Sequence, residues 1–127
     1  MKSQAEIDKF EKTNTQLEAL HNEISMLSKK KPDDAINKFK LQFVNNVLKN
    51  ANELLGEQYK PFSDFTLFDE DALPTNSDVI MILAQYLNCM EKLRSDNIVC
   101  DLGDYYWLIK SQKSKLVTSS PKKLKER

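Results

Sequence analysis

Two glycines, Gly56 and Gly103, are all that the 127-residue sequence contains. An all-β sandwich or barrel needs more glycines than this for its turns, so the scarcity argues against those folds. No apolar run approaches the roughly 18 residues that a membrane-spanning helix requires. The longest run extends from Val79 to Ala84. The first residues are polar and acidic where a secretory signal peptide has an apolar core. We therefore expect a soluble, cytoplasmic protein without membrane contact.

Side chains that bind metals or perform nucleophilic chemistry are also scarce. His21 is the single histidine, and the spacing of Cys89 and Cys100 matches no zinc or redox motif. The acidic residues 69–71 lack the central glycine and terminal glutamate of a calcium-binding EF-hand loop. The sequence has neither a G-x-S-x-G motif nor a glycine-rich phosphate loop. We predict a non-enzymatic protein without cofactor or metal, although folding could still bring an unpredictable pair of carboxylates together.

The net charge is zero, but acidic and basic residues are concentrated in different parts of the chain. The 19 basic and 19 acidic side chains cancel. Up to Ile109 there are 12 basic and 18 acidic residues, whereas from Lys110 onward seven basic residues accompany a single acid, Glu126. The sequence thus has an acidic body and a basic tail. This division is typical of chains that carry an interaction tail.

A polar amphipathic helix is predicted over residues 3–30, within a first segment of residues 1–31. Its apolar residues recur with the a and d spacing of a coiled coil. So narrow a seam must pack on something, because the isolated helix would be marginal in water. It could dock on the second helix of the same chain or pair with a second copy, and we favour a homodimer. The seam consists of Phe10, Leu17, Leu20, Ile24 and Leu27.

Two further helices are predicted within the central segment, residues 32–109. Pro32 suits the first position of the second helix, and Gly56 suits its end. The third helix begins after a capping residue, Thr75, and ends near Ser95. Its apolar stretch from Val79 to Ala84 should be the most buried part of the chain. The core stripe of the second helix contains Ile36, Phe39, Phe43, Val44, Val47, Leu48, Ala51, Leu54 and Leu55.

The loop between these two helices, residues 57–76, is long and rich in aromatic side chains. Loops of this length in compact domains are either ordered by their own packing or functional. We predict that the loop folds back over the core and presents a partner-binding surface. That surface contains Phe62, Phe65, Phe68, Asp69, Glu70 and Asp71.

A short β-hairpin is predicted after the third helix, because residues 98–100 and 105–109 are rich in strand-forming side chains. The tail, residues 110–127, is polar and basic, and we expect it to be flexible. Its cations could neutralise nucleic-acid phosphates, while the neighbouring aromatic residues 105–107 stack on bases. The candidates for this contact are Lys110, Lys113, Lys115, Lys122, Lys123, Lys125 and Arg127. A winged helix has the same order of elements, but so apolar a third helix does not suit the major groove.

These patterns together predict a mainly α fold. It is a small helical bundle with an N-terminal coiled-coil-like helix and a short C-terminal β-hairpin. The lack of catalytic motifs favours a non-enzymatic regulatory module. It would bind an unidentified protein partner through its helical faces or its aromatic-acidic loop. The alternative is a nucleic-acid-binding regulator that uses the basic tail, with an affinity that falls steeply with salt.

Overall fold

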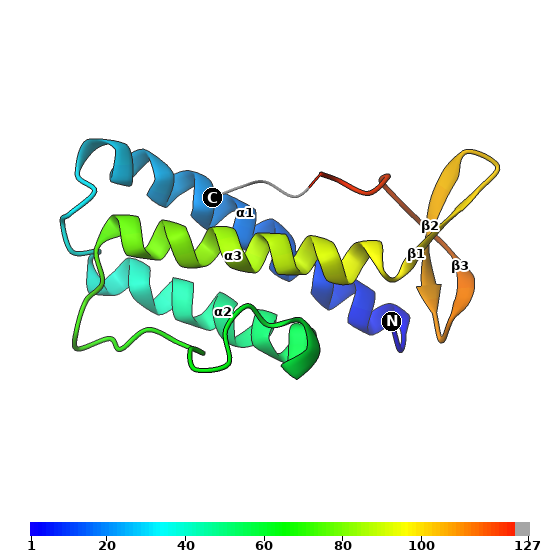
Figure 1. Cartoon of the computed structure of the whole chain (residues 1–127), viewed down its shortest axis with the longest axis horizontal. Coiled ribbons are helices and arrows are strands. Elements are labelled where there is room, and N and C mark those ends of the chain that lie inside the picture. The colour runs from blue at the N-terminus through cyan, green and yellow to red at the C-terminus, as the bar shows by residue number, and fades with distance from the viewer. Residues whose placement is uncertain (124–127) are drawn as a thin grey trace.

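Three helices and one small antiparallel sheet make up the fold in the computed structural model, which describes residues 1–123. Figure 1 shows the helices lying along one another, with the sheet at one end of the bundle. The predicted mainly α class, with strands after the third helix, is confirmed. In chain order the elements are α1 (Gln4–Lys30), α2 (Lys38–Tyr59), α3 (Asn76–Ser95), β1 (Ile98–Asp101), β2 (Asp104–Ile109) and β3 (Gln112–Thr118).

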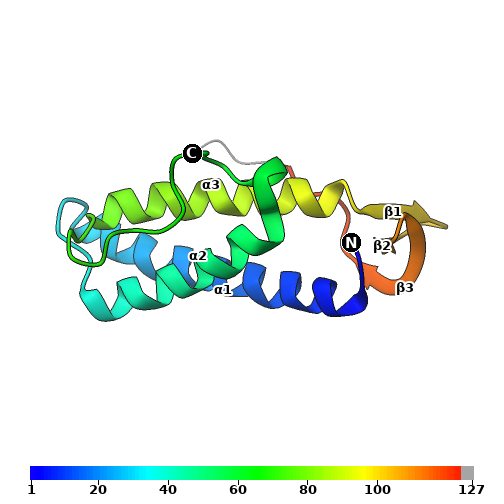
Figure 2. The same cartoon turned by 90° about the horizontal axis from the view of Figure 1, so that it is seen from below.

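The direction of the helices explains the long loop. α1 runs antiparallel to both α2 and α3, so α2 and α3 run parallel to each other (Figure 1, Figure 2). Two successive parallel helices need a connection that returns along the length of the bundle, and residues 60–75 provide it. We call residues 60–75 the return segment. It follows α2, because side chains of that helix bond to its backbone.

Each helix begins at a side chain that caps its first turn. Ser3, Asn37 and Thr75 each accept a hydrogen bond from the backbone N–H three residues ahead, at 3.2, 2.8 and 3.1 Å. Such caps satisfy N–H groups that have no partner within the helix. The predicted cap at Thr75 is confirmed.

The connection between α1 and α2 is a turn at residues 32–33 followed by a short paired stretch, so α2 begins at Lys38 and the predicted start at Pro32 is wrong. Ile36 donates its backbone N–H to the Pro74 carbonyl at 2.9 Å. This bond lies next to an isolated antiparallel bridge between the same two connecting segments. Proline has a suitable φ for a helix start, but here pairing between the two connections satisfies the backbone groups instead.

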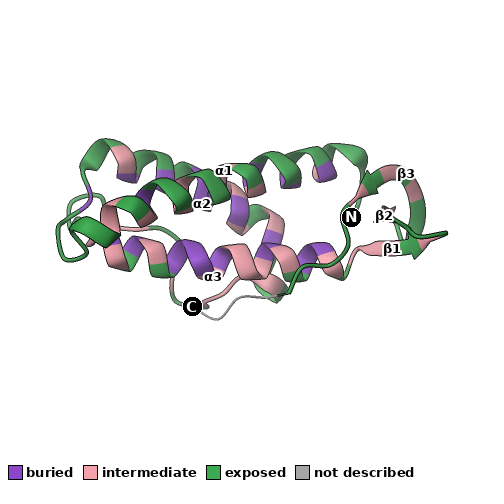
Figure 3. Ribbon diagram, turned by 90° about the horizontal axis from the view of Figure 1, so that it is seen from above, coloured by how far each residue is buried: buried purple, intermediate pink, exposed green. Residues whose placement is uncertain are grey.

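The core lies between the three helices. Figure 3 shows the buried residues on the helix faces that point toward one another, with exposed residues on the outside. The fully buried side chains include Phe10, Leu17, Ile24, Leu41, Leu48, Leu83, Tyr86 and Met90. The predicted buried stretch of α3 is confirmed at Val79, Ile82, Leu83 and Ala84, whereas Met81 is exposed.

The apolar seam of α1 is used inside the chain. Phe10, Leu17 and Ile24 are fully buried, and Leu20 and Leu27 are partly buried. They are buried because α1 packs on both α2 and α3. Of the two predicted alternatives, the structure has docking within the chain. Phe10, Leu17 and Ile24 are covered within the chain and are not accessible to a second copy in this arrangement, whereas the predicted homodimer itself stays a prediction.

Trp107 joins the sheet to the bundle. Its ring is buried and meets Phe10 of α1 edge to face, with the centroids 5.1 Å apart and the planes at 70°. Its indole N–H donates to the Glu11 carboxylate at 3.1 Å. A buried tryptophan combines a large apolar area with a donor that needs a partner, and both requirements are met here. The sheet is thereby fixed to the N-terminal part of α1.

The sheet has three strands in the order β1-β2-β3, where a two-stranded hairpin was predicted. Residues 112–118 form β3, so the prediction of a flexible tail is wrong over this stretch. A polar sequence can form this strand because only alternate side chains face the bundle. Leu116 packs on the core, whereas Lys115 and Val117 are exposed.

The chain after β3 is held against α3 by Arg94, which is only 5% exposed. The guanidinium pairs with the Glu91 carboxylate through two bonds of 2.9 and 2.8 Å. Its other N–H groups donate to the Thr118 hydroxyl and to the carbonyls of Ser119 and Ser120, at 2.9, 2.7 and 2.8 Å. All five guanidinium N–H groups are therefore used, which is what a buried arginine requires.

Replacing Arg94 with alanine should lower the free energy of unfolding by about 3–5 kcal/mol, because Glu91 would lose the partner of its largely buried carboxylate. Urea denaturation followed by circular dichroism at pH 7 measures the change. Lys92→Ala is the matched control. Lys92 pairs with Asp96 at the surface, where an ion pair contributes only about 0–1 kcal/mol. Equal losses in the two variants would contradict the anchoring role of Arg94.

Candidate functional site

Two phenylalanines on the outward side of α2 form an exposed aromatic surface. Phe39 is 69% exposed and Phe43 is 50% exposed, and no other aromatic side chain of residues 1–123 is as open to solvent. The rings are one helical turn apart and meet edge to face, with the centroids 5.0 Å apart and the planes at 72°. We call these two residues the α2 aromatic pair.

The pair is exposed because α2 buries a different stripe. The prediction that Phe39 and Phe43 face the core is wrong. Phe43 lies five positions before the buried Leu48, and five positions correspond to a rotation of about 140° around the helix. The stripe that fills the core is Leu41, Val44, Leu48, Ala51 and Leu55. Successive residues of this stripe are spaced alternately three and four positions apart. That regular spacing is the sequence signal that could have shown that this stripe, and not the aromatic pair, faces the core.

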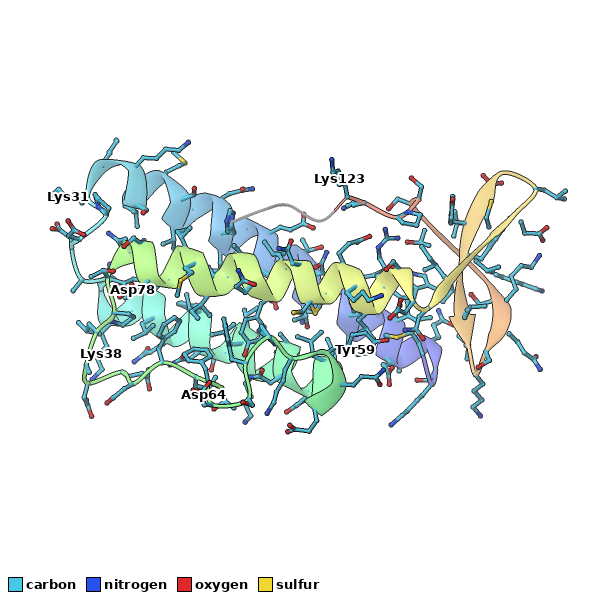
Figure 4. All side chains as sticks on the ribbon, in the orientation of Figure 1. Lys31, Lys38, Tyr59, Asp64, Asp78 and Lys123 are labelled. Atoms are coloured by element: carbon cyan, nitrogen blue, oxygen red, sulfur yellow. The ribbon has the colours of Figure 1, made fainter. Side chains whose placement is uncertain are left out.

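Polar side chains border the aromatic pair. Gln42 and Asn46 are exposed beside it. The Lys40 ammonium is directed to Glu23 of α1, at 3.8 Å. Figure 4 shows Lys38, at the start of α2, at the end of the bundle opposite the sheet. The surface is an apolar patch with amide neighbours, which resembles the composition of protein contact surfaces.

The aromatic residues of the return segment hold that segment in place. Phe62, Phe65 and Phe68 are half-buried and packed on the core, with successive centroids 6.4 and 5.0 Å apart. Asn45 of α2 donates to the Phe68 carbonyl and accepts from the Phe68 N–H, both at 3.0 Å. The predicted folding of this loop over the core is confirmed. The three rings therefore expose only part of their surface to a partner.

The acidic residues of the return segment are at the surface. Asp69, Glu70 and Asp71 are exposed, and the Asp69 carboxylate accepts the Asp71 N–H at 2.9 Å. Leu67 and Leu73 on either side are exposed as well. This stretch stays a candidate for contact with a basic partner.

The predicted basic residues lie on the sheet and on the segment after it. Lys113 is engaged within the chain, because it pairs with Asp101 and lies 5.0 Å from the centroid of the Tyr106 ring. The hydrogen bond to Asp101, and then the charge of that carboxylate, raise the pKa of Lys113. Lys110, Lys115, Lys122 and Lys123 are exposed, whereas Lys125 and Arg127 lie outside the described residues.

The aromatic residues of β2 do not form one stacking platform. Successive side chains of a strand point to opposite faces. Trp107 is buried under the sheet, while Tyr106 lies beside Lys113 on the other face. The outer face of the sheet thus offers a nucleic-acid base the ring of Tyr106 rather than the predicted run of three.

A cleft of about 610 Å³, lined about equally by polar and apolar groups, lies where the start of α1 meets the end of α2. Gly56 in its wall has φ 60° and ψ −169°, a conformation that is open almost only to glycine. The predicted helix end at Gly56 therefore appears as a kink, after which one more turn follows. That turn brings the Tyr59 hydroxyl to the Asp96 carboxylate, to which it donates at 2.7 Å.

Several of the charges in and beside this cleft are paired. The hydrogen bond from Tyr59, and then that from Lys92, lower the pKa of Asp96, and the same bond to Asp96 raises the pKa of Tyr59. The hydrogen bond from Lys9 lowers the pKa of Glu53 across the cleft. Both carboxyl groups are thereby stabilised as anions, which is the opposite of the shift expected of a general acid. This arrangement suits a structural role, with one ion pair between α1 and α2 and one hydrogen bond from α2 to the end of α3.

Among residues 1–123, no group of three or more His, Cys, Asp or Glu side chains is arranged to hold a metal ion. Cys89 and Cys100 are free thiols, and burial raises the pKa of Cys89. No helix in the same range is long and apolar enough to cross a bilayer. No family model, curated protein or solved structure matches the chain. Any function must therefore be inferred from the surfaces of this molecule.

Asn45→Ala should lower the free energy of unfolding by about 2 kcal/mol, because both backbone groups of Phe68 lose their partner. Amide hydrogen exchange at Phe68 should also become faster. Asn46→Ala is the matched control, since this neighbouring asparagine is exposed and should change stability by less than about 0.5 kcal/mol. Unchanged exchange at Phe68 in Asn45→Ala would show that the aromatic rings alone hold the return segment.

Proposed function

We propose that this protein is a non-enzymatic protein-binding module that contacts its partner through the α2 aromatic pair. The exposure of two adjacent phenylalanines on a helix whose opposite face is buried carries the proposal. Phenylalanine is among the side chains enriched in the core of protein interfaces relative to the rest of the surface. Complete burial of a fully exposed phenylalanine is worth about 1.5–3 kcal/mol, and these rings, 69% and 50% exposed, would gain part of that.

The geometry of the pair suits a partner with an apolar groove. Phe39 and Phe43 have the four-residue spacing with which a helix inserts successive anchors into such a groove. Their edge-to-face contact orders the two rings before binding, which reduces the conformational entropy lost in the complex. Gln42 and Asn46 can exchange bonds to water for bonds to the partner at the rim.

α2 presents this surface rigidly. Its opposite face fills the core, Asn45 is bonded to the return segment, and Lys40 is directed to α1. A partner would therefore meet a preformed surface, which favours affinity because little ordering is left to do.

Replacing both Phe39 and Phe43 with glutamine should reduce the partner recovered by affinity capture about tenfold or more. Capture is from the cells that produce the protein, with quantitative mass spectrometry as the readout. Stability should change little, because both rings are exposed and glutamine is a good helix former. Met26→Gln, at an exposed position of α1, is the matched control and should retain the partner. Recovery of the same proteins at wild-type levels by the double variant would overturn the proposal.

A second candidate is a nucleic-acid-binding regulator. It is supported by the exposed Lys115, Lys122 and Lys123 along β3 and the segment after it, together with Tyr106 on the outer face of the sheet. Deleting the chain after Lys110 would not test this candidate cleanly, because it would also remove β3 from the sheet.

Replacement of Lys115, Lys122 and Lys123 with glutamine keeps the strand and removes three cations. If they bind phosphates, gel-shift affinity should fall, and the slope of log K against log salt should decrease by about 0.9 for each phosphate that is no longer neutralised. The matched control replaces Lys29, Lys30 and Lys31, exposed at the far end of α1, in the same way. Equal affinity and equal salt slope in the test variant and the wild type would exclude this mode of binding.

A further inference from the structure

The turn between β1 and β2 contains a residue that is unusual for its conformation. Leu102 and Gly103 connect the two strands, with φ of 52° and 87°. Positive φ at both central residues is the geometry of a type I′ hairpin turn, which favours asparagine, aspartate or glycine at the first position. A leucine there is disfavoured, because its Cβ crowds the backbone in the left-handed region.

The Leu102 side chain gains no packing that would offset this conformation. It is 98% exposed, which is the highest value among the large apolar side chains of residues 1–123. Figure 1 shows the β1–β2 tip projecting away from the helices, at the end of the molecule opposite the start of α2. The leucine therefore lies in water on an accessible projection.

Of the two carboxylates at the tip, one has no cation beside it among residues 1–123 of the free chain. Asp101 and Asp104 lie directly opposite each other, and like charges in such cross-strand pairs are destabilising. Lys113 pairs with Asp101, while Asp104 is exposed. Residues that are unfavourable for the local fold are expected at functional positions, where they are kept because the function needs them.

The second turn of the sheet shows that positive φ angles alone do not mark a contact surface. Lys110 and Ser111, between β2 and β3, have φ of 51° and 65°. Both are polar and exposed, so they face water without a hydrophobic penalty. The exposed apolar side chain between two carboxylates distinguishes the Leu102 turn.

We propose that the β1–β2 tip is a contact surface separate from the α2 aromatic pair. In this contact Leu102 inserts into an apolar pocket of a partner protein, and basic residues border that pocket. The exposed Asp104, which has no ion pair within residues 1–123, would meet the basic border and give the contact its charge complementarity, while Asp101 stays paired with Lys113. The same carboxylates disfavour an anionic membrane surface or a nucleic acid. The complex would bury the leucine and give Asp104 a countercharge.

The substitution Leu102→Asn distinguishes an effect on partner binding from an effect on folding, because it should weaken binding while it stabilises the fold. Asparagine is tolerated in the left-handed region, so the unfolding equilibrium constant of the full chain should fall about tenfold in chemical denaturation. The same variant should lose the partner. Ser111→Gly is the matched control, because it relieves the same conformation in the other turn. It should also stabilise the chain, and it should keep the partner.

The probe for this surface is a photo-crosslinking amino acid placed at position 102 of the full chain in the producing cells, with position 111 as the control. We expect one protein adduct at position 102 that is absent at position 111. The crosslinked peptide should line an apolar pocket with lysine or arginine at its border. Excess wild-type chain should compete for the adduct, and excess Leu102→Asn chain should not.

The absence of an adduct at position 102 would overturn the proposal, as would an adduct only with lipid, nucleic acid or a second copy of this chain. A Leu102→Asn variant that is less stable than the wild type, or that retains the partner, would overturn it as well. Loss of partner in the Phe39/Phe43 double variant, together with full retention in Leu102→Asn, would reject this inference and leave the α2 proposal intact. The reverse result would reject the α2 proposal and support the tip.

Discussion

The burial of one narrow apolar seam on α1 determines much of the architecture. Phe10, Leu17 and Ile24 are fully covered because α1 packs on both other helices, antiparallel to each. α2 and α3 are then parallel, and parallel neighbours need a return segment along the bundle. That segment must itself be fixed, which its half-buried phenylalanines and Asn45 achieve. Aromatic density in a long loop can therefore be a consequence of helix direction.

The same packing decides which surfaces are free. The core takes the α2 stripe centred on Leu48, so the aromatic pair is left on the outside. Trp107 fixes the sheet against Phe10 at the other end of the bundle, and the β1–β2 tip projects from there. The two candidate contact surfaces thus lie at opposite ends of an elongated molecule. A single partner that met both would extend along the bundle, whereas two smaller partners could bind at the same time.

Part of the basic C-terminal region belongs to the folded unit, and the rest lies at the surface. The basic C-terminal part begins with a strand, and the chain after it supplies backbone carbonyls to the buried Arg94. Lys113 of β3 compensates Asp101 of β1, on the far side of β2 in the sheet. Basic residues near a chain end therefore do not by themselves mark an interaction tail, because some of them belong to the folded unit.

Local patterns in the sequence were sufficient for the class of fold, the existence of three helices, the cap at Thr75 and the strands over residues 98–109. These features depend on glycine content, side-chain propensity and the period of a single element. The tertiary structure alone decided whether the α1 seam packs within the chain, which of two overlapping stripes on α2 faces inward, and whether the polar residues 112–118 join the sheet. Each of these outcomes depends on a surface contributed by a distant part of the chain: two helices for the seam, the core for α2, and the free edge of β2 for β3. The period of a helix or strand shows which residues share a face, and only the packing partner determines which face is buried.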